Sequence, residues 1–166
     1  FVIVFAALVG MVWLWMAKRK IEPNTVVKFG LGFLFLAGGF WVFYYTKFFA
    51  GADGKTSLDL FTFGWFIITF GELCLSPIGM SAMTKLSPQK TQAVIMGMWF
   101  LASAYGQYFA GLLGANIAEA AENATNLEKL NTYADGYEQL AIYALVAGVV
   151  LIVISPLVRK LMQDVK

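Results

Sequence analysis

An acidic residue, Glu72, lies in the middle of a long apolar run of this 166-residue sequence. The run extends from Leu60 to Met83, and Glu72 is residue 13 of its 24 residues. If the run crosses a bilayer, the carboxyl group lies near the midplane, where an acidic side chain costs roughly 2.5–3.5 kcal/mol. We therefore predict that Glu72 belongs to a functional site, the alternative being a structural hydrogen bond to another helix.

The residues that follow Glu72 strengthen this interpretation. Ser76 lies one helical turn further on the same face, where it has two candidate partners, a substrate and a backbone carbonyl freed by Pro77. Because Pro77 removes a backbone donor and clashes with the preceding turn, Pro77 and Gly79 predict a kink or an unwound segment. Secondary transporters build their binding sites at broken helices near the midplane.

A second polar face lies in the next apolar run, residues 94–118. Trp99, Ser103 and Gln107 follow one another at intervals of one helical turn. Trp99 is either an interfacial anchor or a cavity wall, and the other two either bond a neighbouring helix or line an aqueous path. A stripe of small residues on the same run predicts close helix packing; its members are Ala102, Gly106, Ala110 and Gly114.

Several chemistries are excluded by composition. The sequence has no histidine and one cysteine, Cys74, so it offers no imidazole base, no cysteine-rich metal site and no internal disulfide. One Glu and one Ser do not make a hydrolytic site. We expect no metal, no cofactor and no enzymatic activity, and the net charge of +2 is too small for nucleic-acid binding.

The elements that must position these residues are apolar helices. The sequence is 60% hydrophobic and 13% charged, against about 45–50% and about 25% in average soluble domains. Only helices or closed barrels satisfy the backbone in lipid. We predict an all-α membrane protein, a single bundle over residues 1–166, with spans at about 1–17, 26–46, 60–83, 94–118 and 140–158. The first span looks truncated, which indicates an interior cut through a longer protein.

The charges predict an orientation. One set of alternate loops and segment ends carries nine basic residues and the other carries three, a clear positive-inside asymmetry. The linkers 18–25 and 84–93 and the C-terminal tail should therefore be cytoplasmic, in a multi-pass protein of the cell membrane. The linkers 47–59 and 119–139 should face outward.

Three short stretches resemble the proton-dependent oligopeptide transporter family of the major facilitator superfamily. They are Gly71–Ser81, Thr84–Pro88 and Met96–Leu101. By this resemblance the chain would hold the last five helices of a twelve-helix core, ending in a cytoplasmic tail. The missing N-terminal half, with its acidic-and-arginine proton motif, and the seventh-helix acid are not in this sequence.

The resemblance also implies roles for single residues. Glu72 would match the tenth-helix acid that meets the amino terminus of the peptide, and Ser76 the serine one turn away. Trp99 would match the eleventh-helix tryptophan that lines the side-chain pocket. Met80 stands near the cytoplasmic gate, which makes Pro77, Gly79 and Met80 candidate gate or hinge residues.

The expected function is therefore proton-coupled uptake of di- and tripeptides by alternating access, with small peptides, protons and lipid as partners. Some relatives of the family carry other solutes such as nitrate, but a fixed negative charge at Glu72 favours a cationic amine over an anion. The main alternative is a non-transporting subunit of an energy-converting complex in which Glu72 relays protons. A relay needs further intramembrane ionisable groups, which other subunits would have to supply.

Overall fold

Five α-helices follow the five apolar runs in the computed structural model, which describes residues 1–51, 53–117 and 124–161. They are α1 (Val2–Lys18), α2 (Thr25–Tyr45), α3 (Leu58–Leu86), α4 (Gln92–Ile117) and α5 (Asn126–Leu161), with a short 3₁₀ helix, η1 (Thr46–Phe49), after α2. The described residues contain no strand. The predicted all-α class is confirmed; residue 118, the last of the expected fourth span, lies outside the described residues.

Three of the described helices are long and apolar enough to cross a membrane by length and composition. They are α2 together with η1, α3 and α5. Helix α1 is apolar but has 17 residues. Helix α4 has 26 residues and no charge, but Ser103, Gln107 and several glycines interrupt its apolar sequence. The spans assigned to α1 and α4 therefore stay predictions.

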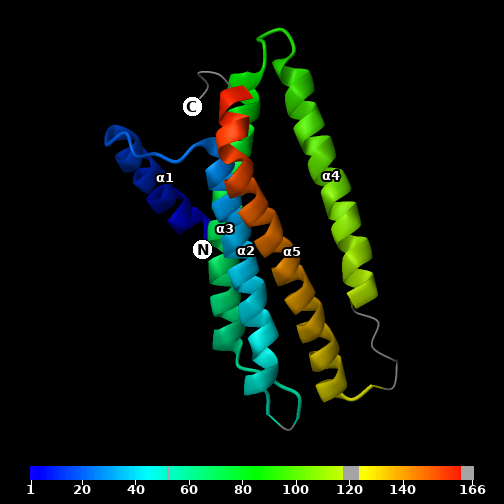
Figure 1. Cartoon of the computed structure of the whole chain (residues 1–166). Coiled ribbons are helices and arrows are strands. Elements are labelled where there is room, and N and C mark those ends of the chain that lie inside the picture. The colour runs from blue at the N-terminus through cyan, green and yellow to red at the C-terminus, as the bar shows by residue number, and fades with distance from the viewer. Residues whose placement is uncertain (52, 118–123, 162–166) are drawn as a thin grey trace.

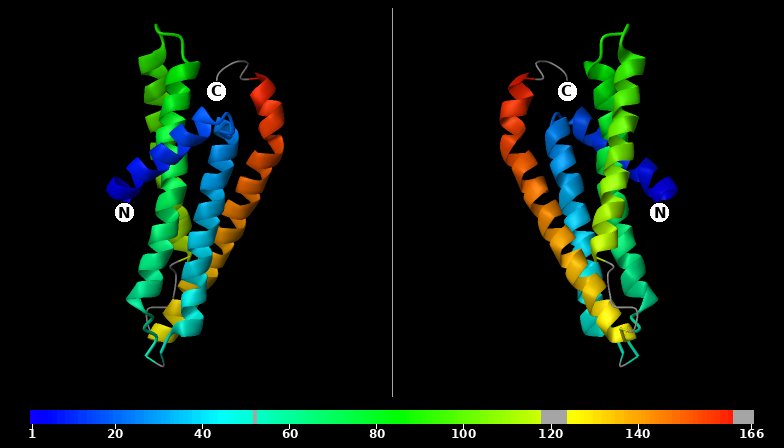
Figure 2. Two further views of the ribbon diagram at one scale, coloured as in Figure 1. Left: turned by 90° about the vertical axis from the view of Figure 1, so that its left-hand side faces the viewer. Right: turned by 90° about the vertical axis from the view of Figure 1, so that its right-hand side faces the viewer.

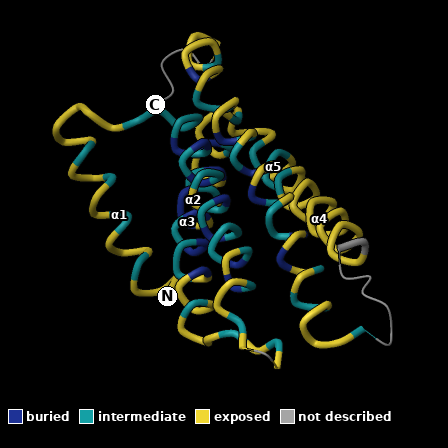
Figure 3. Tube along the Cα trace, turned by 60° about the horizontal axis from the view of Figure 1, so that its bottom comes forward, coloured by how far each residue is buried: buried dark blue, intermediate teal, exposed yellow. Residues whose placement is uncertain are grey.

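Helices α2, α3 and α5 pack side by side and form the centre of the molecule (Figures 1 and 2). Helix α1 leans away from them, while α4 stands apart along most of its length and meets α3 near the turn that joins the two (Figure 1). Burial follows this arrangement, because buried residues concentrate on α2, α3 and α5 and the described part of α4 is largely exposed (Figure 3).

Glycines let the three central helices approach closely. A Cβ added to Gly71 of α3 would lie 2.8 Å from the carbonyl oxygen of Gly32 on α2. On the other side of α2, a Cβ on Gly30 would lie 3.0 Å from the carbonyl oxygen of Gly148 on α5. Small residues at such positions bring helix backbones together in a membrane, where dispersion contacts drive association. Helix α2 therefore has two glycine-lined faces, one for each neighbour.

The last helix begins earlier than the linker 119–139 suggested. Thr125 and Glu128 form a capping box, in which the Glu128 carboxylate accepts hydrogen bonds from Thr125 N–H at 2.7 Å and from Thr125 Oγ1 at 2.9 Å. Buried Ala134 and Ala141 then face α2 with the spacing of a helix. Helix α5 thus begins within the stretch predicted as an outward linker, where polar side chains on the exposed face masked an amphipathic helix, and the span predicted at 140–158 lies inside it. Residues 119–123 lie outside the described residues.

The alternation of helix directions gathers the basic connections at one end of the bundle. The α1–α2 connection, the α3–α4 turn and the end of α5 lie together at the top of Figure 1. At the opposite end, Lys47 Nζ pairs with Asp135 Oδ1 at 2.8 Å and lies 4.1 Å from the Tyr44 ring centroid. This contact joins η1 to the extension of α5.

Candidate functional site

Glu72 lies at the midpoint of α3, equally far from Leu58 and Leu86. Its sequence neighbours Gly71 and Leu73 are buried against the central helices, whereas Glu72 is exposed. Ser76, one turn further, is exposed on the same face. Within the described part of the chain, the Glu72 carboxylate has no ion-pair or hydrogen-bond partner. The helix thus presents an uncompensated carboxylate and a hydroxyl, one turn apart, outside the packed centre.

Helix α3 stays helical through Pro77 up to Leu86. Of the two expectations for this position, an unwound segment is therefore wrong, and a kink at Pro77 stays a prediction. Pro77 still lacks the N–H that the Leu73 carbonyl would accept four residues earlier. Met80, in the next turn, is exposed, and its carbonyl accepts a hydrogen bond from Thr84 Oγ1 at 2.8 Å. Helix α3 therefore lacks one backbone hydrogen bond about one turn after Glu72, but the helix itself continues.

The structure brings Trp99 of α4 against α3. A Cβ added to buried Gly79 would overlap the Trp99 indole and lie 3.0 Å from Cζ of Phe29 on α2. Near the α3–α4 turn, Gln92 Nε2 donates a hydrogen bond to the Thr84 carbonyl at 3.2 Å, which connects the N-terminal end of α4 to α3. Trp99 is therefore fixed by a contact between helices. The sequence predicted Trp99 and Gly79 as separate site residues, but it did not predict their contact or the proximity of Phe29. The sequence feature that could have indicated this contact is a glycine within an apolar run.

The remaining residues predicted for the site are exposed on α4. Ser103 donates to its own helix, with Oγ 3.0 Å from the Trp99 carbonyl oxygen. Gln107 is exposed one turn further. The stripe of small residues is open as well, since nothing lies within 4 Å of a Cβ built on Gly106 or Gly114. Within the described residues this stripe packs no helix; the packing glycines are those of α2, α3 and α5.

These placements describe one side of a site. Glu72 and Ser76 lie on an exposed face of α3, whereas Trp99 is half-buried against Gly79 of α3. A ligand that reached all three side chains would need further walls. The described residues contain no group of three His, Cys, Asp or Glu side chains that could hold a metal ion. What the arrangement offers chemically is one carboxylate for a cation, one hydroxyl and one indole surface.

Comparison with known sequences gives one consistent picture. The sequence profile of the POT family matches residues 1–134. The peptide transporter YePEPT of Yersinia enterocolitica is 35% identical over 99% of this chain and 31% of its own length. Dipeptide and tripeptide permease A of Chromobacterium violaceum is 33% identical over 84% of this chain and 28% of its own length. These relatives are transporters and not enzymes, and they do not favour the proton-relay subunit.

Solved structures of this family resemble the chain as well. A crystal structure of a POT family transporter in complex with a thioalcohol-conjugated peptide superposes on this chain with a TM-score of 0.76, at 29% identity, covering 94% of this chain and 29% of that one. The crystal structure of tetrameric PepTSo2 gives a TM-score of 0.72 at 28% identity, covering 95% of this chain and 31% of that one. The chain spans about a third of the length of the relatives that it matches.

Proposed function

Because this chain belongs to the POT family, we propose that it is the C-terminal part of a secondary active transporter that couples the uptake of di- and tripeptides to protons. The protein is an integral membrane protein, and we place it in the cell membrane with its C-terminus in the cytoplasm. The missing N-terminal half would supply the other walls of the site and the groups that couple transport to protons.

The observation that carries this proposal is the exposed, unpaired carboxylate of Glu72 at the midpoint of α3. A peptide's terminal ammonium would compensate it by a charge-assisted hydrogen bond, which is stronger in a low-dielectric cavity than in water. Ser76 would accept or donate a further hydrogen bond to the peptide. Trp99 would line the pocket for a peptide side chain, and Ser103 and Gln107 would continue the polar wall along α4.

Alternating access fits the way this bundle is built. Helices α2, α3 and α5 are joined by close glycine contacts and would move as one body against the N-terminal half. Pro77 weakens the ladder of α3 between Glu72 and the cytoplasmic end, while Gly79 and Met80 occupy the following turn. Bending at these three residues would open and close the cytoplasmic exit.

The test is uptake of a labelled dipeptide by the full-length transporter in proteoliposomes under an inward proton gradient. Truncating one partner of a desolvated charge pair costs about 2–5 kcal/mol, so we expect Glu72→Gln to lower uptake by about 100-fold. Glu138→Gln, the same change at the opposite end of the bundle from the basic turns, should leave uptake unchanged. Normal uptake by a correctly inserted Glu72→Gln protein would overturn the role of this carboxylate.

A further inference from the structure

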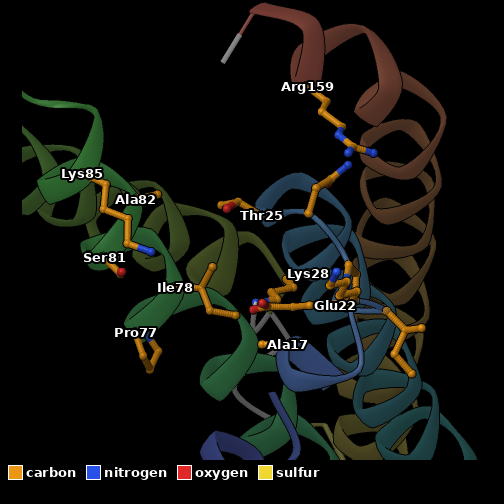
Figure 4. A pocket seen from close by; sticks show the side chains of 14 residues that line it. Ala17, Glu22, Thr25, Lys28, Pro77, Ile78, Ser81, Ala82, Lys85 and Arg159 are labelled. Atoms are coloured by element: carbon orange, nitrogen blue, oxygen red, sulfur yellow. Dashed lines mark hydrogen bonds and ion pairs between the residues drawn. The ribbon is translucent and has the colours of Figure 1, made fainter. Parts of the chain in front are cut away.

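A cavity of about 820 Å³ opens at the end of the bundle where the basic connections gather (Figure 4). Its walls come from the end of α1 and the connection after it, the start of α2, the last turns of α3 and the end of α5. Pro77 lines it, but Glu72, Ser76 and Trp99 do not. The three residues proposed to contact the peptide therefore lie outside this cavity.

Positive charge dominates this cavity. Four cationic side chains, each from a different segment, line it, namely Lys20, Lys28, Lys85 and Arg159. Its one acidic residue, Glu22, is paired with Lys28. Figure 4 shows Lys85 and Arg159 on different sides of this central pair. Among the described residues, Lys20 and Arg159 have no ion-pair partner. The charges of Lys20 and Arg159 attract an anion that reaches several walls at once.

The central cation is built into the fold. Lys28 is 8% exposed, and its ammonium lies 4.7 Å from the centroid of the Trp13 ring on α1 in addition to its contact with Glu22. Lys20 has a φ of 59°, which a residue with a side chain rarely adopts. This left-handed residue directly follows the C-cap of α1, where such a conformation is common. Of the two cations at the ends of the α1–α2 connection, Lys28 is therefore held by contacts, whereas the Lys20 side chain is exposed.

The other walls suit a phosphate group attached to an apolar chain. Thr25 and Ser81 contribute hydroxyl groups that make no hydrogen bond to any described residue. Ile21, Ile78 and Ala82 contribute apolar surface beside them. A soluble phosphate would use the cations and hydroxyls and leave the apolar surface wet, whereas a lipid would use both.

We propose that this cavity binds the phosphate of an anionic phospholipid, with the acyl chains running along the apolar wall between α1 and α3. Its place at the helix ends puts it at the depth of the lipid headgroups. Basic clusters at helix ends on the cytoplasmic side bind anionic headgroups, each cation adding to the attraction. This inference does not depend on the substrate that the transporter carries.

The test measures lipid binding by the delipidated full-length transporter, with native mass spectrometry as the readout. We expect phosphatidylglycerol to bind at least about tenfold more tightly than phosphatidylcholine. The double variant Lys20→Asn with Arg159→Gln should abolish most of this preference. The matched control, Lys18→Gln with Lys90→Gln, removes two charges from the same end outside the cavity and should keep it. Arg159→Lys, which conserves the charge, should also keep it.

Three results would overturn the proposal. If the control double variant lost the preference for phosphatidylglycerol to the same extent, diffuse surface charge would be what attracts the lipid. Competition by inorganic phosphate at millimolar concentration would mean a site for a soluble anion. Unchanged binding by the folded double variant would mean that the lipid binds elsewhere. Peptide uptake is not the readout, so failure of the peptide-transport proposal and failure of this one are distinguishable.

Discussion

Gly79 and Trp99 form the residue-scale contact that positions one wall of the candidate site. A Cβ at position 79 would overlap the indole, so Gly79→Ala must displace Trp99 or separate α4 from α3. A well-placed aromatic contact contributes about 0.5–1.5 kcal/mol. We expect Gly79→Ala in the full-length transporter to raise the KM for dipeptide uptake about two- to tenfold, measured in proteoliposomes.

Gly97→Ala is the matched control, because the same methyl group, two residues before Trp99, would meet open space in this chain. Its KM should equal that of the wild type. A KM that Gly79→Ala leaves unchanged would show that the position of Trp99 does not matter for the peptide.

The sequence predicted the place of Glu72 well and the setting of Trp99 poorly, for a physical reason. A carboxylate in an apolar run is conspicuous because its desolvation is costly wherever the helix packs. A tryptophan near the start of a helix is equally typical of an interfacial anchor. The contact with Gly79 joins separate helices, so local spacing does not reveal it.

At the scale of elements, the interface between α2 and α3 depends on glycine. A methyl group on Gly71 would lie 2.8 Å from the backbone oxygen of Gly32, and neither helix can yield locally. Overpacking of this kind costs about 1–3 kcal/mol, more than alanine's better helix propensity returns. We expect Gly71→Ala to lower the thermal unfolding midpoint of the purified full-length transporter.

Gly111→Ala provides the comparison, since its methyl group would point into open space in the described chain. This variant should keep or slightly raise the midpoint. A Gly71→Ala protein as stable as wild type would mean that α2 and α3 can move apart without a loss of stability. The close approach of the two helices would then not stabilise the bundle.

Element boundaries show where sequence reasoning reached its limit. The five apolar runs predicted where the helices lie, because a helix that crosses a bilayer must be long and apolar. Hydropathy did not reveal the start of α5, since that segment is half polar and packs on α2 through Ala134 and Tyr137, whose ring centroid lies 5.0 Å from that of Phe43. The stripe around Gly106 has no partner among the described residues, so its predicted role in helix packing stays a prediction.

At the scale of the whole molecule, the sorting of charges to the two ends predicts one orientation in the membrane. With Cys74 and any cysteine of the full-length transporter outside this chain replaced by alanine, a membrane-impermeant maleimide applied to intact cells should modify Asp53→Cys in the α2–α3 connection. It should not modify Lys90→Cys in the α3–α4 turn until the cells are permeabilised. The excess of Lys and Arg at the Lys90 end is the physical reason.

Both positions are exposed, so accessibility within the protein does not decide the outcome. The protein with all of these cysteines replaced and no new cysteine should stay unlabelled under both conditions. Labelling of Lys90→Cys in intact cells together with protection of Asp53→Cys would reverse the assigned orientation.

The two glycine-lined faces of α2 also determine the order in which its helix contacts can form during biosynthesis. Helix α3 leaves the ribosome directly after α2, but Gly30 and its partner Gly148 are separated by 118 residues. At about 5–20 residues per second, the second partner arrives on the order of 10 s after the first. During that interval α2 and α3 can pair as a hairpin, whereas the partner of Gly30 has not yet been synthesised. We therefore expect the face of α2 around Gly30 to stay uncovered until α5 is complete.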